Sequence, residues 1–345
     1  MTQPFRAAAV QAAPCFLDLD AGIDKAVRLI AEAASEGAQL VAFSETWLPG
    51  YPNYIWLGPV AWQMQFAGRY FENSIVAGSE HEARLSEACA KYRIQLSMGC
   101  SERDGGSLYI AQWHFDETGR VVNRRRKLKP THVERTVYGE GDGSDLSVVE
   151  TSLGRIGQLA CWEHLQPLSK YAMYAQNEQI HCAAWPNLHL YKDTAHALGH
   201  EVNNAASLVY AVEGGCFVLA PCSLVTKEIQ DEICQGDPAK EALCPLGGGY
   251  TRIYAPDGRD IGANLPHDQE GLVYAEIDLS LIAYAKTAAD PAGHYARRDA
   301  TRLLINRRKQ RPVVNFDDAP GWETSGWETM DVAAAPPAVM GKPAE

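Results

Sequence analysis

Hydrophobic positions along the chain fall into two kinds of segment. Short continuous apolar runs that stop at turn residues predict buried β-strands. The clearest of these runs lie at 5–12, 40–43, 94–100, 156–160, 180–185, 216–221 and 272–277. Longer segments with apolar residues three or four positions apart predict amphipathic helices at 18–37, 79–91, 168–178 and 194–213. Strands therefore alternate with helices through most of the chain.

Capping and turn residues mark the ends of these elements. Asp18 or Asp20 can cap the first helix and Gly37 ends it, while Pro167 suits the first turn of the helix that follows the strand at 156–160. Turn-rich connections at 116–119 and 256–259 predict two hairpins, at 108–124 and 253–261. Because hairpins interrupt the alternation of strands and helices, we expect mixed sheets in a layered α/β sandwich.

The chain has no Pro/Gly/Ser-rich linker before its C-terminal part, although 345 residues would permit two domains. We therefore expect one domain over residues 1–310, followed by a tail at 311–345. From residue 321 the composition turns to Gly, Ala, Pro, Glu and Thr, which predicts disorder from about residue 331.

Composition and charge narrow the class of protein. Hydrophobic residues at 46% and charged residues at 21% are ordinary for a globular protein with a large core. A net charge of −12 argues against nucleic-acid and anionic-membrane partners, because the basic run at 124–129 is short. We see neither a signal peptide nor a run of eighteen apolar residues, so we expect a cytoplasmic protein.

Nine cysteines without a CxxC pair argue against a disulfide framework or a cysteine zinc site. One of them, Cys161, stands at the end of a predicted strand, and Glu45 and Lys127 stand just past two others. Strand ends of layered α/β folds meet at one rim, so these three side chains can converge. Glu45 can accept the thiol proton, and the Lys127 ammonium favours the thiolate and the charge that develops on a substrate. Taken singly, each residue is also compatible with a purely structural role.

Three segments carry a resemblance to a known family: FSETWLPGYP at 43–52, RRKLKPTHVER at 125–135 and CWEH at 161–164. They closely resemble the signature segments of the carbon-nitrogen hydrolase superfamily, and within it the true nitrilases, over about residues 5–310. The resemblance implies a four-layer α-β-β-α sandwich that dimerises through an outer helical layer. It also implies that Cys161 is the nucleophile, Glu45 the general base and Lys127, rather than Lys129, the stabiliser of the tetrahedral intermediate. Glu134 matches a fourth family carboxylate that helps to hold and protonate groups at the site.

The implied activity is hydrolysis of an organic nitrile to the carboxylic acid and ammonia, through a thioimidate and a thioester on the cysteine, with no metal or organic cofactor. Segments 161–174 and 181–186 look most like bacterial arylacetonitrilases, which implies aryl or arylaliphatic nitriles. Segment 290–295 resembles a family element in which His294 is linked to activity and assembly, within an assembly segment at about 280–310. The ARRD at 296–299 departs from the SRPD that is usual there. Many nitrilases also build helical filaments.

Neighbours of these motifs are the expected lining and supports of the site. The expected substrate-binding residues are Tyr51, Trp162, Trp185, Pro186 and Asn187, and the expected supporting residues are His132, His164 and His294.

Several features admit competing interpretations. His164 could form a cysteine–histidine dyad, and His196, His200 and Glu201 could face a metal; we consider structural roles the better interpretation of both groups. The triplet GGG at 247–249 lacks the spacing of a phosphate-binding loop.

The alternative functions are a cyanide dihydratase, an amidase of the same superfamily, and a non-catalytic, filament-forming scaffold. We expect the partners to be a small nitrile, water and further copies of the chain.

Overall fold

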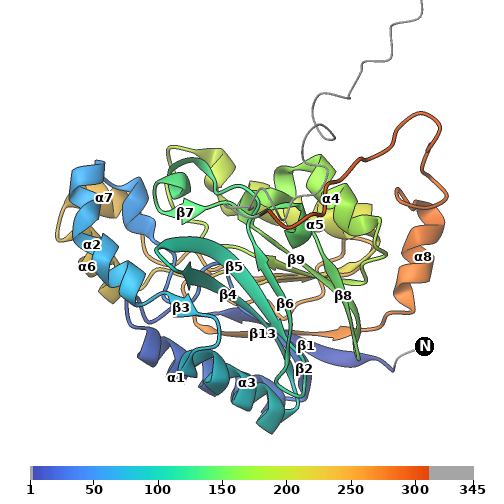
Figure 1. Ribbon diagram of the computed structural model, residues 1–345, viewed down its shortest axis with the longest axis horizontal. Helices are drawn as coiled ribbons and strands as arrows, with labels where there is room; N and C mark the ends of the chain where they lie inside the picture. Colours follow the sequence, from blue (N-terminus) through green and yellow to red (C-terminus); the bar gives the residue numbers. More distant parts are fainter. Residues whose placement is uncertain (1–2, 311–345) are drawn as a thin grey trace, which may run out of the picture. The chain divides into compact units, whose positions relative to one another are not determined.

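Two β-sheets form the centre of the computed structural model, which describes residues 3–310 (Figure 1). The first sheet has the strand order β13-β1-β2-β4-β5-β6, with β3 beside β4 and β7 beside β5. Its strands are β1 Phe5–Gln11, β2 Ala38–Ala42, β3 Ile75–Val76, β4 Gln95–Asp104, β5 Ser107–Phe115, β6 Val121–Arg126, β7 Tyr138–Gly139 and β13 Gly271–Ile277. The pairs β1–β2 and β2–β4 are parallel, whereas β1–β13, β4–β5 and β5–β6 are antiparallel, so this sheet is mixed.

The second sheet has the strand order β12-β11-β10-β9-β8. Its strands are β8 Val148–Thr151, β9 Gly154–Ala160, β10 Ile180–Ala184, β11 Phe217–Ala220 and β12 Arg252–Tyr254. The central strands β9, β10 and β11 are parallel, and β8 and β12 pair with their neighbours in the antiparallel direction. One antiparallel strand therefore flanks the parallel centre on each side, so this sheet is mixed as well.

Helices cover the outer face of each sheet (Figure 1). On the first sheet lie α1 Leu19–Ser35 and α3 Glu80–Tyr92, and on the second lie α4 Pro167–Tyr174 and α5 His200–Gly214. Outside these layers lie α2 Val60–Glu72, α6 Lys227–Cys234, α7 Pro238–Leu243 and α8 Leu281–Ala288. No helix among residues 3–310 is long and apolar enough to cross a membrane.

The core follows the same layers. Small and branched side chains of the two sheets meet in the middle, where Ala7, Leu40 and Ala42 of the first sheet share a buried cluster with Ile180 and Leu219 of the second. Two further clusters bury the apolar faces of the outer helices against their sheets. Alternate residues of a strand point to opposite faces, so nearly continuous apolar strands suit this double burial. The predicted α-β-β-α sandwich with mixed sheets is confirmed.

Local signals explain most element boundaries. Asp18 caps α1 by accepting a hydrogen bond from the backbone of Ala21, and Pro167 occupies the first turn of α4. The predicted long helix at 194–213 is wrong in its first part, because α5 begins at His200. A separate 3-10 helix, His196–Leu198, and the extended Gly199 precede it. The predicted disorder from residue 331 lies outside the described residues.

Candidate active site

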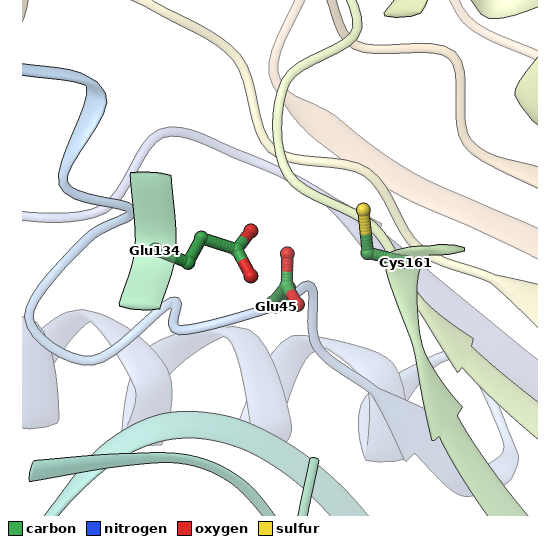
Figure 2. A group of neighbouring side chains, drawn as sticks. All are labelled: Glu45, Glu134 and Cys161. Carbon is green, nitrogen blue, oxygen red and sulfur yellow. The ribbon is translucent and has the colours of Figure 1, made fainter. Parts of the chain in front are cut away.

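Strand ends of both sheets bring four ionisable side chains together. Glu45 follows β2, Lys127 is the first residue after β6, and Cys161 is the first residue after β9. The fourth, Glu134, lies in the 3-10 helix His132–Thr136. Figure 2 shows the Glu45 carboxyl between the side chains of Glu134 and Cys161. The Glu45 backbone N–H donates to the carbonyl of Trp185 beyond β10 (3.2 Å), which ties the two sheets together at the site.

Lys127 joins the two carboxylates. Its ammonium donates to Glu45 Oε1 and to Glu134 Oε2, both at 2.8 Å, and all three side chains are buried. Glu134 is held further by the backbone N–H of Thr131 (2.6 Å) and by the hydroxyl of Tyr51 (2.7 Å). Among the described atoms Glu45 Oε2 has no hydrogen-bond partner, so this oxygen can still accept a hydrogen bond.

Glu45, Glu134 and Cys161 also resemble a metal site, because one possible ligand atom of each lies within 4.8 Å of the others. The positive charge between the two carboxylates is, however, supplied by the ammonium of Lys127. No second group of this kind occurs among residues 3–310, so His196 and His200 do not meet a third ligand there. The ring of His200 instead stacks on that of Tyr250, with 3.8 Å between the ring centroids.

Burial and mutual charge set the protonation of the site. Burial raises the pKa of Glu45 to about 8, against the opposing effect of the Lys127 ammonium. Burial and the neighbouring Glu45 raise the pKa of the Cys161 thiol well above its usual value, again opposed by Lys127. For Lys127, burial alone would lower the pKa, but the charges of Glu134 and Glu45 outweigh it and hold the pKa well above its usual value. The Cys161 thiol therefore keeps its proton in the resting site, and Glu45 binds a proton more readily than an ordinary carboxylate does.

Cys161 sits on a sharp turn between β9 and the 3-10 helix Cys161–Leu165. Its φ of 50° lies in the left-handed region, which costs a non-glycine residue free energy and is typical of functional turns. This turn leaves Cys161 8% exposed at the edge of a cavity, and the backbone N–H of Trp162 lowers the pKa of its thiol.

A buried ion pair clamps the turn to the loop that carries Lys127. Glu163 accepts two hydrogen bonds from Arg125 (2.7 and 2.9 Å), one from the N–H of Ala160 (2.8 Å) and one from the N–H of Leu128 (3.0 Å). Because Ala160 precedes Cys161 and Leu128 follows Lys127, this single carboxylate fixes the spacing between the thiol and the ammonium.

The cavity beside Cys161 has aromatic and aliphatic walls. Four of the five predicted substrate-binding residues, Tyr51, Trp162, Pro186 and Asn187, line it. Its volume is about 30 Å³, which is room for one or two water molecules. The remaining lining residues are Trp56, Thr131, Glu134, Leu188, Leu190, Leu198 and Asn203.

Trp185, the fifth predicted residue, does not line the cavity. Its indole is buried behind the site, where it donates to the hydroxyl of Ser207 (2.9 Å) and stacks on the ring of His164. An aromatic residue just past a strand end can point into the cavity or into the core. Here Trp185 points into the apolar layer beneath α5.

The predicted supporting histidines have different surroundings. Both ring nitrogens of His164 are engaged, one with the carbonyl of Cys161 (2.6 Å) and one with His181 (2.9 Å), so neither is available to the thiol and a cysteine–histidine dyad does not form. His132 is exposed and stacks on Trp56 of the cavity wall. His294 is exposed in the segment after α8.

Asn203 is a lining residue that the sequence did not single out. It accepts a hydrogen bond from the indole of Trp162 (3.0 Å) and donates to the carbonyls of Leu198 and Gly199 (3.0 and 2.7 Å). It thereby holds the loop before α5 against the cavity. A single polar residue inside an amphipathic helix carries no local signal of this role.

The chain matches the model of the carbon-nitrogen hydrolase family over residues 6–287. It is 53% identical to a nitrilase of Pseudomonas syringae pv. syringae, with 93% of this chain and 95% of the relative covered. It is also 50% identical to an arylacetone-specific nitrilase of Alcaligenes faecalis (90% and 86% covered) and 50% identical to an aliphatic nitrilase of Rhodococcus rhodochrous (90% and 82% covered).

Solved structures resemble the fold. A carbon-nitrogen hydrolase from Helicobacter pylori G27 superimposes with a TM-score of 0.68 at 20% identity, over 86% of this chain and 97% of that one. At this identity the likeness supports the sandwich of sheets and helices and nothing finer.

Proposed function

The chain belongs to the carbon-nitrogen hydrolase family, and on that premise we propose that it is a nitrilase that converts an organic nitrile and two water molecules to a carboxylic acid and ammonia. The observation that carries the proposal is the buried cluster of Glu45, Lys127, Glu134 and Cys161 at the edge of an apolar cavity. Relatives named as nitrilases at about half identity over most of the chain support the same reaction.

In the first half of the reaction Glu45 Oε2 takes the proton of the Cys161 thiol, and the sulfur adds to the nitrile carbon. The nitrile nitrogen receives that proton, which leaves a neutral thioimidate on Cys161. Lys127 stabilises the negative charge that develops on the nitrogen, because its ammonium is fixed in a dry site by two carboxylates.

In the second half Glu45 deprotonates a water molecule that adds to the thioimidate carbon. Transfer of protons to the nitrogen expels ammonia and leaves a thioester. A second water molecule adds in the same way, the carbon–sulfur bond breaks, and the acid leaves while the thiol regains its proton. Glu134 keeps Lys127 and Tyr51 in place through each addition.

The cavity walls favour aryl or arylaliphatic nitriles. Tyr51, Trp56 and Trp162 offer aromatic surface close to the sulfur, and leucines complete the wall. A benzene ring is larger than the present cavity of about 30 Å³, so binding requires some of the lining side chains to move outward.

We also propose that copies of the chain associate through the outer helical layer of the second sheet. Large apolar side chains are exposed there, namely Leu168 (70%) on α4 and Leu208, Val209 and Val212 (38–45%) on α5. In the longer helical assembly, His294 and the segment at about 280–310 form a second contact. The size of the purified protein in solution, with and without Leu168→Glu, tests the dimer and the longer assembly. The proposed location is the cytoplasm.

The test of the activity is ammonia release from phenylacetonitrile, mandelonitrile, a short aliphatic nitrile, cyanide and phenylacetamide. We expect release from the aryl nitriles, and loss of it in Cys161→Ala, Glu45→Gln and Lys127→Met. Activity on the amide alone would identify an amidase, activity on cyanide alone a cyanide dihydratase, and activity on none of them a scaffold. Near-normal activity in any folded variant would refute the role given to that residue.

A further inference from the structure

A chain of buried polar side chains lies behind Cys161 and takes no part in the mechanism above. His164 Nδ1 contacts the carbonyl oxygen of Cys161 (2.6 Å), and His164 Nε2 contacts His181 Nε2 (2.9 Å). His181 Nδ1 in turn contacts Glu178 Oε1 (2.6 Å), whose other oxygen accepts a hydrogen bond from the hydroxyl of Tyr210 (2.6 Å). All four side chains are at most 2% exposed.

The carbonyl at one end and the neutral ring of His164 together fix the direction of the hydrogen bonds that His164 makes. A carbonyl oxygen only accepts, so His164 Nδ1 carries a proton and donates it. Burial and the adjacent His181 hold the pKa of His164 well below its usual value, so the ring is neutral and its Nε2 is an acceptor. His181 Nε2 must then be the donor.

The contact between His181 Nδ1 and Glu178 Oε1 contains one proton. Whether the imidazole or the carboxyl holds it, His181 Nε2 keeps its own proton and continues to donate to His164. Hydrogen bonds that follow one another in the same direction polarise each other in a buried environment. We call Glu178, His181 and His164 the relay.

Packing holds the relay in place. The ring of His181 stacks on Tyr210 with 3.8 Å between centroids, and the ring of His164 stacks on Trp185 with 5.0 Å. A Cβ at position 157 would come within 1.9 Å of Glu178 Oε1, so only glycine on β9 admits the carboxyl. Such a buried, fully oriented arrangement costs desolvation, which points to a purpose beyond packing.

The relay ends on the peptide unit that follows the nucleophile. The carbonyl of Cys161 and the N–H of Trp162 belong to this one peptide, and the N–H, which is adjacent to Cys161 along the chain, lowers the pKa of its thiol. We propose that the relay polarises this peptide, so that the Trp162 N–H becomes a stronger donor to the thiolate, and that Glu178 and His181 are therefore positioning residues for a nucleophile they do not touch. The inference rests on the proposed role of Cys161.

The size of the effect follows from typical values. A backbone donor in such a site is worth about 100- to 1000-fold in rate, and polarisation along a hydrogen-bonded chain strengthens one bond by about 10–30%. The relay is then worth about 2- to 8-fold in kcat. The same factor corresponds to an upward shift of about 0.2 to 0.9 pH unit in the titration of the Cys161 thiol when the relay is cut.

Two substitutions at position 164 separate the local bond from the relay. The amide nitrogen of asparagine can take the place of Nδ1, so His164→Asn keeps a donor to the Cys161 carbonyl but does not reach His181. The longer His164→Gln places its amide near Nε2, so it keeps a contact with His181 but loses the bond to the carbonyl. Alkylation of Cys161 by iodoacetamide, followed against pH by mass spectrometry of the labelled peptide, reports on the thiolate in each variant.

We expect His164→Asn to raise the midpoint of alkylation by about 0.2 to 0.9 pH unit and to lower kcat by about 2- to 8-fold, with KM changed by less than about twofold. His164→Gln should raise the midpoint of alkylation and lower kcat by at least as much as His164→Asn does. Glu178→Ala should raise the midpoint by the same amount. Glu178→Gln should have a midpoint close to that of the unmodified protein, because the glutamine amide can donate to His181 and accept from Tyr210. In the His164→Asn background Glu178→Ala should have no further effect on the midpoint.

An unchanged alkylation midpoint in folded His164→Asn and Glu178→Ala, with only a lower melting temperature, would overturn the relay and leave a structural role. If the variants at position 164 do not fold, Glu178→Ala and Glu178→Gln decide whether the relay acts on the Cys161 thiol. Alkylation does not depend on turnover, so the two proposals fail separately. If the midpoint shifts but the protein hydrolyses no nitrile, the nitrilase proposal is refuted and the relay is supported. If the protein hydrolyses nitriles and the variants show neither a shift nor a change in turnover, the relay is refuted and the nitrilase proposal is supported.

Discussion

Replacement of Arg125 by methionine tests the clamp between the two halves of the site. The guanidinium is fully buried and donates to both oxygens of Glu163, and also to Gln112 (2.8 Å). The substitution fills a similar volume but leaves the Glu163 carboxylate buried without a positive partner. Two backbone N–H donors, from Ala160 and Leu128, remain on it.

Breaking one side of a buried ion pair costs about 3–5 kcal/mol of unfolding free energy. The two remaining N–H donors place Arg125→Met at the lower end of this range, about 3 kcal/mol, which corresponds to a melting temperature lower by roughly 6–12 °C. Activity should fall further than stability explains, because Glu163 sets the distance between the Cys161 turn and the Lys127 loop. Calorimetric unfolding and ammonia release, measured well below the melting temperature, check both effects.

The neighbouring Arg124 supplies a matched control. It pairs with Glu82 at 2.6 Å, but its side chain is 40% exposed. Surface pairs of this kind contribute about 0–1 kcal/mol, so Arg124→Met should lower the melting temperature by no more than about 4 °C. Equal effects of the two substitutions, or an Arg125→Met variant as stable and active as the unmodified protein, would refute the reasoning.

Three further predictions concern the site and its support. Because the Glu45 pKa is raised to about 8 and only the ionised form can accept the thiol proton, kcat/KM should rise with pH through an apparent pKa near 8; a profile that is flat between about pH 6 and about pH 9 would contradict this. Gly157→Ala should destabilise the protein by more than about 2 kcal/mol in denaturant titrations, since the added Cβ would lie 1.9 Å from Glu178, whereas Gly68→Ala in the open part of α2 should not. Asn203→Leu removes the partner of the Trp162 indole, so KM for an aryl nitrile should change by more than about threefold with kcat changed less; equal KM values would exclude a role for this contact.

The sequence predicts those parts of the fold that depend on local patterns. Continuous apolar runs located most strands of the two sheets, and Asp18 and Pro167 marked helix starts, because these signals act within a few residues. Helices α2, α6, α7 and α8 were not predicted. Helix α5 was extended back to residue 194, because the polar first turn of α5 resembles the loop before it.

The residues of the candidate site also fall into those that local patterns identify and those that they do not. Glu45, Lys127, Glu134 and Cys161 were identified from short motifs, and the structure brings them together; their catalytic roles stay predictions. Residues that act through long-range contacts were missed. Asn203 reaches Trp162 from a helix about forty positions later, and the Glu178 carboxyl fits into its buried place because Gly157 on β9 leaves room for it. No local pattern reports a contact of that kind.

The position of Lys127 has a consequence for the conditions in which the site can work. Its ammonium is 1% exposed and is neutralised by two carboxylates of the same chain, so the site contains its own counterions. Dissolved ions screen exposed charges over about 8–10 Å of water, but they act much less on a buried pair. Hydrolysis of a nitrile releases an ammonium carboxylate, so the ionic strength of the medium increases as the reaction proceeds. Because the ion pairs of Lys127 are buried, the ammonium carboxylate that the reaction produces should weaken them little.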